Sequence, residues 1–381
     1  MLINRLRRSL LTLGALATFA VATPSWAAES FTPFEVKDLA GRTVKVEKAP
    51  QRFVVANYIA NFLMVGGAKS LDSVVAMTQD GWIETRRGEY EVLTQAFPKI
   101  KEIPSIGGYH DNILNSEKIL ALRPDVVLIN TSQYADNSQR VEIFEKAGIR
   151  VVVLDYHAMK QANHIQSTQI LGKLLGRELV AKAQSDRYAE VINTIDSRIA
   201  LLPDSAKHKR VYIEAGTKGV GEYGNSYNGS VLWGAIVKNL QGANIAENMK
   251  QPYSPLDREF VLAQNPQVIV MAGSIWHNAN ESDQMRMGLT VDEATAQARL
   301  AGFAKRPLWE KLSAVQTGDV YAVDHGSLRC MMDYTFSMFL AKVLYPETFA
   351  DFNPKVELEM FYKTYLPEVD ARGTFFIQLN Q

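Results

Sequence analysis

The chain contains 381 residues, of which 41 are basic and 41 acidic, so its formal charge is zero. This balance excludes the basic domain that is typical of nucleic-acid-binding proteins, and the length is sufficient for two domains with separate cores. The single cysteine, Cys330, excludes an internal disulfide and is expected to be a buried thiol.

The first 27 residues have the pattern of a secretory signal peptide. Arginines at positions 5, 7 and 8 precede an apolar run from Leu10 to Val21, and small residues follow at Ser25 and Ala27. This pattern predicts cleavage after Ala27 and export of the mature protein. The apolar run is too short to cross a bilayer comfortably, and no later segment has about 20 uninterrupted apolar residues.

Strand and helix signals alternate over residues 28–158. After an expected hairpin over 34–46, strand signals lie at 53–56, 74–77, 126–130 and 151–155. Helical stretches lie between them, at 58–64, 116–122 and 140–147. Such alternation predicts a mostly parallel sheet covered by helices, and we assign these residues to an N-terminal lobe.

Residues 159–203 carry helical periodicity and no strand signal. A first helix is interrupted at Gly176, and a longer one runs from Arg177 to Leu202 before Pro203 ends it. At 1.5 Å per residue the longer helix spans about 39 Å, enough to link two lobes as a stiff hinge. The C-terminal lobe is expected over 204–381. Its strand signals are at 210–214, 268–272 and 320–323, and its helical stretches are near 230–240, 257–264, 330–344 and 355–365.

One segment of the chain occurs twice. The residues from Glu117 to Ile129 recur, with Glu, Leu-Ala, Pro and an apolar run at the same spacing, from Glu259 to Met271. Each copy reads as a short helix, a proline that stops it and a strand buried on both faces. A chain that builds one α/β lobe twice has a cleft between the lobes, and small molecules tend to bind in such clefts.

The sequence resembles the periplasmic substrate-binding proteins of ABC importers for ferric siderophores, haem and cobalamin. The resemblance covers essentially the whole mature chain. It rests on segments 106–109, 115–128, 147–153, 171–176, 242–246, 259–271 and 318–321. It implies an α/β fold with two Rossmann-like lobes, mostly parallel sheets and one long linking α-helix. It also implies a monomeric protein of the periplasm with no intrinsic cofactor and no enzymatic activity.

The resemblance further implies a membrane partner. In this family a glutamate on each lobe docks on arginines of an ABC-type permease of the inner membrane, and Glu117 and Glu259 occupy the matching places. The alternative is that these acids only favour the first turn of a helix, after Ser116 and Asp257 as N-caps. Both roles are compatible with each other.

Loop residues after the predicted strands are the candidate ligand-binding residues, because ligands bind beyond the carboxyl ends of parallel strands. In the first lobe they are Tyr58, Trp82, Arg86, Tyr109, His110, Tyr134 and His157. In the second lobe they are Tyr223, Tyr227, Trp276, His277, His325 and Arg329. The aromatic residues offer flat apolar contact, and the arginines can pair with anionic oxygens. Tyr109 is the strongest candidate, because Gly107 and Gly108 let the backbone approach the cleft closely.

A small-molecule ferric chelate, the siderophore class, is the ligand that we expect, with several alternatives left open. His110, His157, His277 and His325 fall at strand-end loops and could bind bare zinc or manganese. Haem or cobalamin could use a Tyr or His as an axial ligand, and a molybdate-type oxyanion could bind to arginines and backbone amides. An exported metal-dependent enzyme is less expected, because the chain lacks Gly-x-Ser-x-Gly, His-Glu-x-x-His and phosphate-loop motifs.

Overall fold

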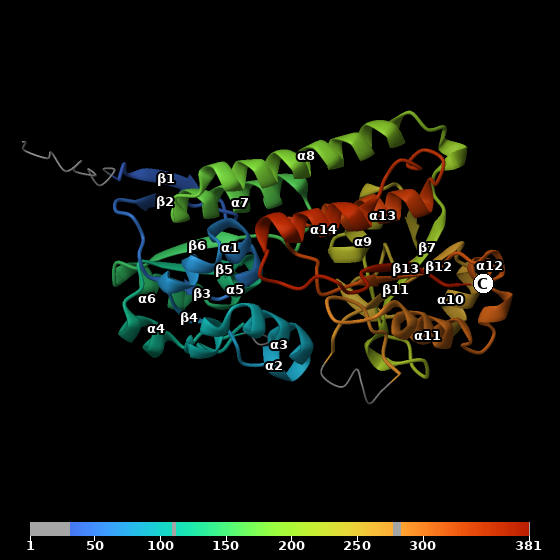
Figure 1. The fold of residues 1–381 in the computed structure, drawn as a ribbon, viewed down its shortest axis with the longest axis horizontal. Coiled ribbons are helices and arrows are strands. Elements are labelled where there is room, and N and C mark those ends of the chain that lie inside the picture. Colours follow the sequence, from blue (N-terminus) through green and yellow to red (C-terminus); the bar gives the residue numbers. More distant parts are fainter. Residues whose placement is uncertain (1–30, 109–111, 277–282, 381) are drawn as a thin grey trace, which may run out of the picture. The chain divides into compact units, whose positions relative to one another are not determined.

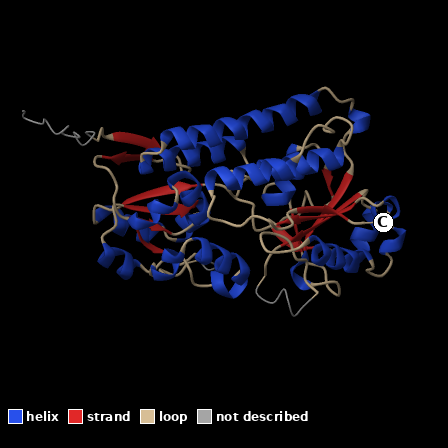
Figure 2. Cartoon of the chain, viewed as in Figure 1, coloured by secondary structure: helices blue, strands red, loops and turns tan. Residues whose placement is uncertain are grey.

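The computed structural model describes residues 31–108, 112–276 and 283–380. The predicted signal peptide lies outside the described residues. Residues Pro33–Gln381 form one unit with two α/β lobes, whose strands and covering helices are drawn in Figures 1 and 2. The predicted fold class is therefore confirmed.

The first lobe is built on a four-stranded parallel sheet in the order β4-β3-β5-β6. The strands are β3 (Phe53–Val55), β4 (Val74–Met77), β5 (Val126–Asn130) and β6 (Arg150–Leu154). The helices are α1 (Ile59–Gly66), α2 (Trp82–Thr85), α3 (Arg87–Ala96), α4 (Ser116–Leu122), α5 (Thr131–Asp136) and α6 (Ser138–Lys146). Every residue of β5 is buried, which explains its uninterrupted apolar sequence.

An antiparallel hairpin of β1 (Phe34–Lys37) and β2 (Thr43–Val46) protects the edge of this sheet. The Asp38 carboxylate accepts the Val153 N–H at 3.2 Å, and the Arg42 guanidinium donates to the Val151 carbonyl at 2.8 Å. These bonds satisfy backbone groups of β6 that an edge strand would otherwise expose.

Two helices follow the first lobe, α7 (Gln161–Leu175) and α8 (Glu178–Ala200). Gly176 ends α7 in the left-handed conformation, at φ 61°. Gly172 lets the pair pack closely, since a Cβ atom there would lie 2.5 Å from that of Ala181. With 23 residues, α8 is about 34 Å long and extends alongside both lobes (Figure 1).

The second lobe contains a five-stranded sheet in the order β13-β12-β11-β7-β9. Strands β7 (Arg210–Ala215), β9 (Ala243–Asn244), β11 (Val268–Gly273) and β12 (Val320–Asp324) are parallel, and β13 (Phe376–Gln378) is antiparallel. A separate antiparallel pair is formed by β8 (Asn225–Tyr227) and β10 (Tyr253–Pro255). The helices are α9 (Leu232–Asn239), α10 (Arg258–Gln264), α11 (Glu293–Ala304), α12 (Ser313–Thr317), α13 (Tyr334–Leu344) and α14 (Pro354–Tyr365).

The repeated segment folds alike in both lobes, as α4–β5 and as α10–β11. Arg123 and Asn265 end the two short helices in the left-handed conformation, at φ 45° and 43°, directly before the repeated proline. One expected detail is wrong: Asn115, not Ser116, is the N-cap of α4, and its side chain accepts the Lys118 N–H at 3.0 Å.

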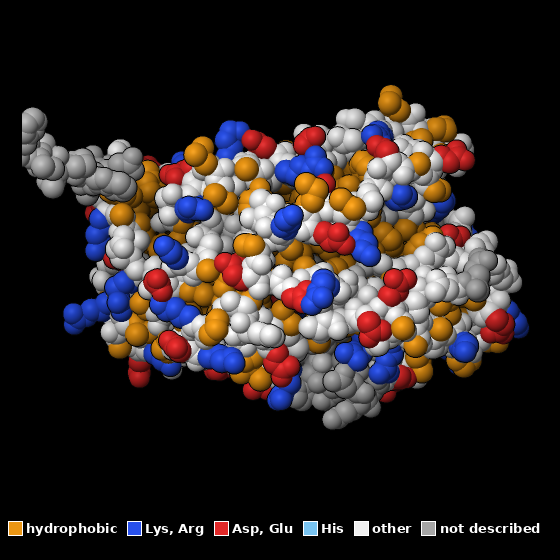
Figure 3. Space-filling model, viewed as in Figure 1, with side chains coloured by type: hydrophobic (Ala, Val, Ile, Leu, Met, Phe, Trp, Pro, Cys, Tyr) orange, Lys and Arg blue, Asp and Glu red, His pale blue; other side chains and the backbone are white. Residues whose placement is uncertain are grey.

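The described surface agrees with the balanced composition. On the face drawn in Figure 3, basic and acidic side chains are interspersed over both lobes. Within the described ranges, no helix combines the length and the apolar character that crossing a membrane requires.

Candidate functional site

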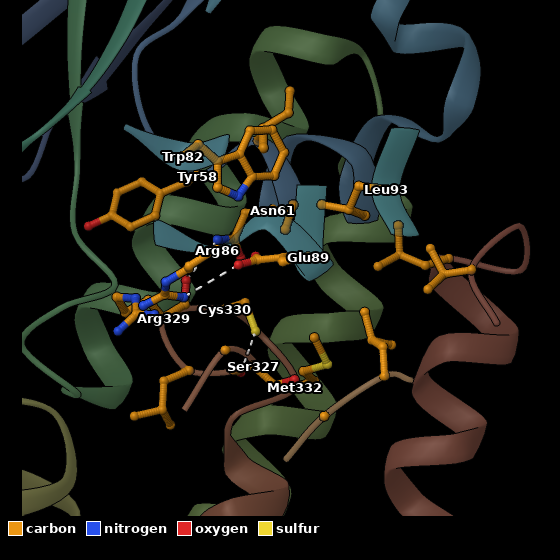
Figure 4. A pocket seen from close by; sticks show the side chains of 18 of the residues that line it. Tyr58, Asn61, Trp82, Arg86, Glu89, Leu93, Ser327, Arg329, Cys330 and Met332 are labelled. Atoms are coloured by element: carbon orange, nitrogen blue, oxygen red, sulfur yellow. Dashed lines mark hydrogen bonds and ion pairs between the residues drawn. The ribbon is translucent and has the colours of Figure 1, made fainter. Parts of the chain in front are cut away.

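A cavity lies where loops at the strand ends of the two lobes meet (Figure 4). Its volume is about 140 Å³, which accommodates on the order of ten water molecules. From the first lobe it is lined by the β3–α1 loop and by residues of α1, α2 and α3, and from the second by residues that follow β11 and β12. The polar lining residues include Asn57, Tyr58, Asn61, Thr78, Arg86, Glu89, Ser274, Asp324, Ser327 and Arg329.

The two lobes touch directly beside this cavity. The Asn61 side-chain amide on α1 donates to the Arg329 carbonyl at 2.9 Å. Gly88 in α3 packs against Ile275 after β11, so closely that a Cβ atom at Gly88 would lie 1.8 Å from Ile275 Cγ2. Asn61 is buried, and its Oδ1 has no hydrogen-bond partner among the described residues.

Arg86 and Arg329 bring two positive charges to the cavity, one from each lobe. The Arg86 guanidinium lies 3.5 Å from the Glu89 carboxylate and 5.6 Å from the centre of the Trp276 ring. Arg329 Nη1 lies 3.4 Å from His325 Nε2. Because guanidinium groups bind carboxylate, phosphate and phenolate-type oxygens, this pair favours an anionic ligand.

The histidines near these arginines are neutral. Burial and the adjacent Arg329 charge lower the pKa of His157 to about 3. Burial, Arg329 and Arg86 hold the pKa of His325 well below its usual value. Neither imidazole therefore adds positive charge at neutral pH.

His157 is fixed by Tyr58. The Tyr58 hydroxyl lies 2.6 Å from His157 Nδ1 and accepts the Tyr156 N–H at 3.2 Å. Burial raises the pKa of Tyr58, so its hydroxyl keeps its proton. The preceding Asp155 has a structural role, since its carboxylate accepts the backbone N–H groups of His157 and Ala158.

His325 lies in an aromatic environment. Its Nδ1 accepts the indole N–H of Trp233 at 3.0 Å. The rings of Tyr227 and Trp276 each lie 5.9 Å from its ring. Trp233 was not predicted as a site residue, because it lies within the apolar helix α9 and its polar atom gives no signal in the pattern.

Two acids also line the cavity, Glu89 and Asp324. Asp324 accepts the Ser327 hydroxyl at 2.6 Å and backbone N–H groups of Gly326 and Ser327. Burial, with a contribution from Glu89, raises the pKa of Asp324 to about 6. In the part of the chain that the structure describes, no group of three or more His, Cys, Asp or Glu residues is arranged to hold a metal ion.

The predicted site residues fall into four sets. Four line the cavity: Tyr58, Trp82, Arg86 and Arg329. Four more contact these residues or one another without lining it: His157, Tyr227, Trp276 and His325. Tyr109, His110 and His277 lie outside the described residues.

The structure places the remaining two candidates elsewhere. Tyr134 packs under the Arg42 guanidinium, 4.5 Å from its carbon, at the hairpin-covered edge of the first sheet. Tyr223 accepts the Trp309 indole N–H at 2.7 Å and lies 4.6 Å from Arg306, which is paired with the buried Glu214. Both tyrosines therefore pack against arginines elsewhere in the fold and do not line the cavity.

Glu117 and Glu259 are exposed and occupy the first turns of α4 and α10. They occupy equivalent places in the two copies of the repeat. A carboxylate in the first turn also interacts favourably with the helix dipole. The geometry is therefore compatible with both expected roles, permease docking and stabilisation of the helix.

Comparison with known proteins agrees with this architecture. Residues 62–325 match the family described as periplasmic binding protein. The chain belongs to the periplasmic binding protein family. A TroA-like periplasmic binding protein, FepB from Veillonella parvula, superposes with a TM-score of 0.82 at 30% sequence identity, over 91% of this chain and 99% of that one.

Two further periplasmic binding proteins are more distantly similar, the first in fold and the second in sequence. The molybdate-bound MolA of Haemophilus influenzae has a TM-score of 0.65 at 15% identity, over 89% of this chain and 99% of its own. The vitamin B12-binding protein of Yersinia pestis is 25% identical over 187 residues, which cover 49% of this chain. That match spans 60% of the length of the relative. Each relative is named as a binding protein and not as an enzyme, in line with the prediction.

Proposed function

We propose that this periplasmic binding protein captures an anionic metal chelate of the ferric siderophore class between its lobes and delivers it to an ABC-type permease. The observation that carries the proposal is the pair Arg86 and Arg329, which reach one cavity from opposite lobes. An anion between them is bound by both lobes at once. Ligand binding and lobe closure are thereby linked, because one anion can contact both arginines only when the lobes are together.

The walls of the site fit an organic chelate. Trp82 and Tyr58 line the cavity, and Trp276 is next to Arg86. Aromatic faces of this kind supply apolar contact to catecholate or hydroxamate backbones, while the guanidinium groups pair with the anionic oxygens. The protein acts as a monomer in the periplasm, and Glu117 and Glu259 seat it on the permease.

A smaller oxyanion such as molybdate is a second candidate, which the volume of the cavity favours. About 140 Å³ is less than a siderophore or a haem occupies, so these ligands require the lobes to separate further. A tetrahedral oxyanion fits without that movement. The two candidates share the same chemistry, anionic oxygens between two arginines, and differ in size.

The test is a tryptophan-fluorescence titration of the mature protein. The panel is ferric catecholate, ferric hydroxamate, ferric citrate, haem, cobalamin, molybdate and zinc. Saturable quenching by one ferric chelate class supports the siderophore proposal, and a response to molybdate alone supports the oxyanion. A response to zinc alone contradicts both, because bare zinc needs lone pairs and carboxylates and not guanidinium groups.

A further inference from the structure

The hydrogen bond from Trp233 determines which nitrogen of His325 carries a proton. An indole N–H is a donor only, so His325 Nδ1, which lies 3.0 Å from Trp233 Nε1, must accept with its lone pair. Both side chains are buried. A neutral imidazole has one N–H, and that proton is then on Nε2.

The Nε2–H group points toward a second donor. Arg329 Nη1 lies 3.4 Å from His325 Nε2, and a guanidinium group has no acceptor. Two N–H groups at this distance cannot bond to each other. They can both donate to one acceptor that lies to the side of the line joining the two nitrogens, about 2.9 Å from each, and Arg329 itself lines the cavity.

We propose that His325 Nε2–H and Arg329 Nη1–H together bind one anionic oxygen of the ligand, and that Trp233 is the positioning residue that selects the required His325 tautomer. This inference rests on the proposed function for the anionic character of the ligand. The shared chemistry is an oxygen that accepts two N–H bonds, as in a chelate phenolate or carboxylate, or in a free oxyanion.

The same geometry assigns His325 a role other than metal ligation. A histidine binds a metal through a lone pair, and the lone pair of His325 is directed at Trp233, inside the second lobe. Its other nitrogen carries a proton beside the Arg329 cation. In this proposal His325 therefore donates a hydrogen bond to an oxygen atom of the ligand and does not bind the metal itself.

His164 provides an internal contrast. Its Nδ1 lies 3.1 Å from the Lys160 carbonyl and its Nε2 lies 3.0 Å from the Asp333 carboxylate. Both neighbours are acceptors, so His164 is expected to carry two protons. The fold thus holds one histidine between acceptors and another between donors, and the two must differ in protonation at the same pH.

The tautomer can be observed directly by ¹⁵N NMR of the histidine-labelled, ligand-free mature protein. We expect His325 to show an unprotonated Nδ1 and a protonated Nε2 that do not titrate between about pH 5 and 8, with His164 at pH 5 as the doubly protonated reference. In Trp233→Phe the fixed preference for one tautomer should be lost. A His325 with its proton on Nδ1, or one that becomes charged within this range, would overturn the proposal.

Binding of two probes, molybdate and ferric tris-catecholate, tests the oxygen contact. Removal of a hydrogen bond to a charged group should weaken the bound probe by about tenfold to a hundredfold in His325→Phe. His325→Gln, which can place an amide N–H near the same position, should recover part of that loss. The control is His208→Phe, since His208 is exposed.

The outcomes separate this inference from the proposed function. Unchanged affinity in His325→Phe, with wild-type protein binding a probe, overturns the inference and leaves the function standing. If the wild-type protein binds neither probe nor any other anion of the panel, the proposed function fails, and the oxygen contact fails with it. The NMR result still decides the tautomer in that case.

Discussion

His164 Nε2 lies 3.0 Å from Asp333 Oδ2, and both side chains are fully buried where α7 meets the residues before α13. Asp333 also accepts the Tyr188 hydroxyl from α8 at 3.0 Å. This cluster joins both linking helices to the second lobe, four residues beyond Arg329. An ion pair in this place fixes how the linking helices sit on the lobe that carries half of the site.

The buried pair predicts a loss of stability at alkaline pH. Burial alone lowers the pKa of His164, but the charge of Asp333 and the hydrogen bonds to Asp333 and to the Lys160 carbonyl more than offset this, so the pKa is raised. The stability from His164 is then fully present below about pH 6.5 and is lost as the pH rises through the raised pKa. Urea unfolding of the wild-type protein at pH 6 and pH 9 measures this loss.

Breaking the pair supplies the matched test. Asp333→Asn should lower the free energy of unfolding by about 3 kcal/mol at pH 6, because it leaves a buried cation unpaired. Asp351→Asn, which removes the partner of Arg198 in an exposed pair, should cost about 1 kcal/mol or less. Equal losses in the two variants would contradict the assigned charge of His164.

At acidic pH the prediction concerns His157, whose folded-state pKa is about 3. The unfolded chain takes up a proton near pH 6.5 and the folded chain does not, so stability is present above about pH 6.5 and is lost as the pH falls toward 3. His157→Gln should therefore lose less stability than the wild-type protein between pH 7 and pH 4.5. The urea midpoint at each pH measures this loss of stability, and His208→Gln, at an exposed histidine, is the control. A parallel pH dependence in both variants and the wild-type protein would show that His157 does not stay neutral.

Much of the fold could be predicted from the sequence because its signals are local. The buried strand β5, the stop at Pro124 and the repeat at Pro266 are each visible in short segments. Tyr58, Arg86 and Arg329 were expected near one another because loops after parallel strands share one edge of a sheet, and all three line the cavity. Helix α11 was not predicted, because its alanine-rich sequence lacks a clear apolar stripe.

The remaining features could not be predicted because they depend on the directions of side chains and on contacts between the two lobes. Tyr134 and Tyr223 fit the same loop pattern as Tyr58, but Arg42 and Arg306 hold them in the scaffold. Trp233 contributes only its indole N–H, from the buried helix α9 to His325. Residue spacing in the sequence does not show where that N–H points. The reason for a glycine at position 88 is visible only in the structure, where Ile275 of the other lobe packs against it.

Gly88 predicts how the lobes close. Gly88→Val should prevent the contact with Ile275, since the new side chain would overlap a β-branched residue that cannot move away easily. The expected result is at least about tenfold weaker binding of molybdate, which fits between the lobes in their present separation, with the thermal midpoint little changed. Gly221→Ala is the control, because a Cβ atom there meets no atom within 4 Å. Unchanged affinity in Gly88→Val would show that the contact does not limit closure.

The permease contacts predict a separation between binding and uptake. Glu117→Lys combined with Glu259→Lys should abolish uptake in cells, because both docking charges are reversed, while ligand affinity stays within a few-fold. The control is Glu142→Lys with Glu310→Lys, since these acids are also exposed but lie outside the repeat. Uptake that survives the first double change would refute the docking role.

The most direct test of the central claim is calorimetric titration of the wild-type protein and of Arg86→Gln combined with Arg329→Gln, with ferric tris-catecholate and with molybdate. Two charge-assisted contacts are removed, so the double variant should bind the wild-type ligand at least about a hundredfold more weakly. Its thermal midpoint should change little, because both arginines are only partly buried. Equal affinity in the two proteins would contradict an anion site between the lobes.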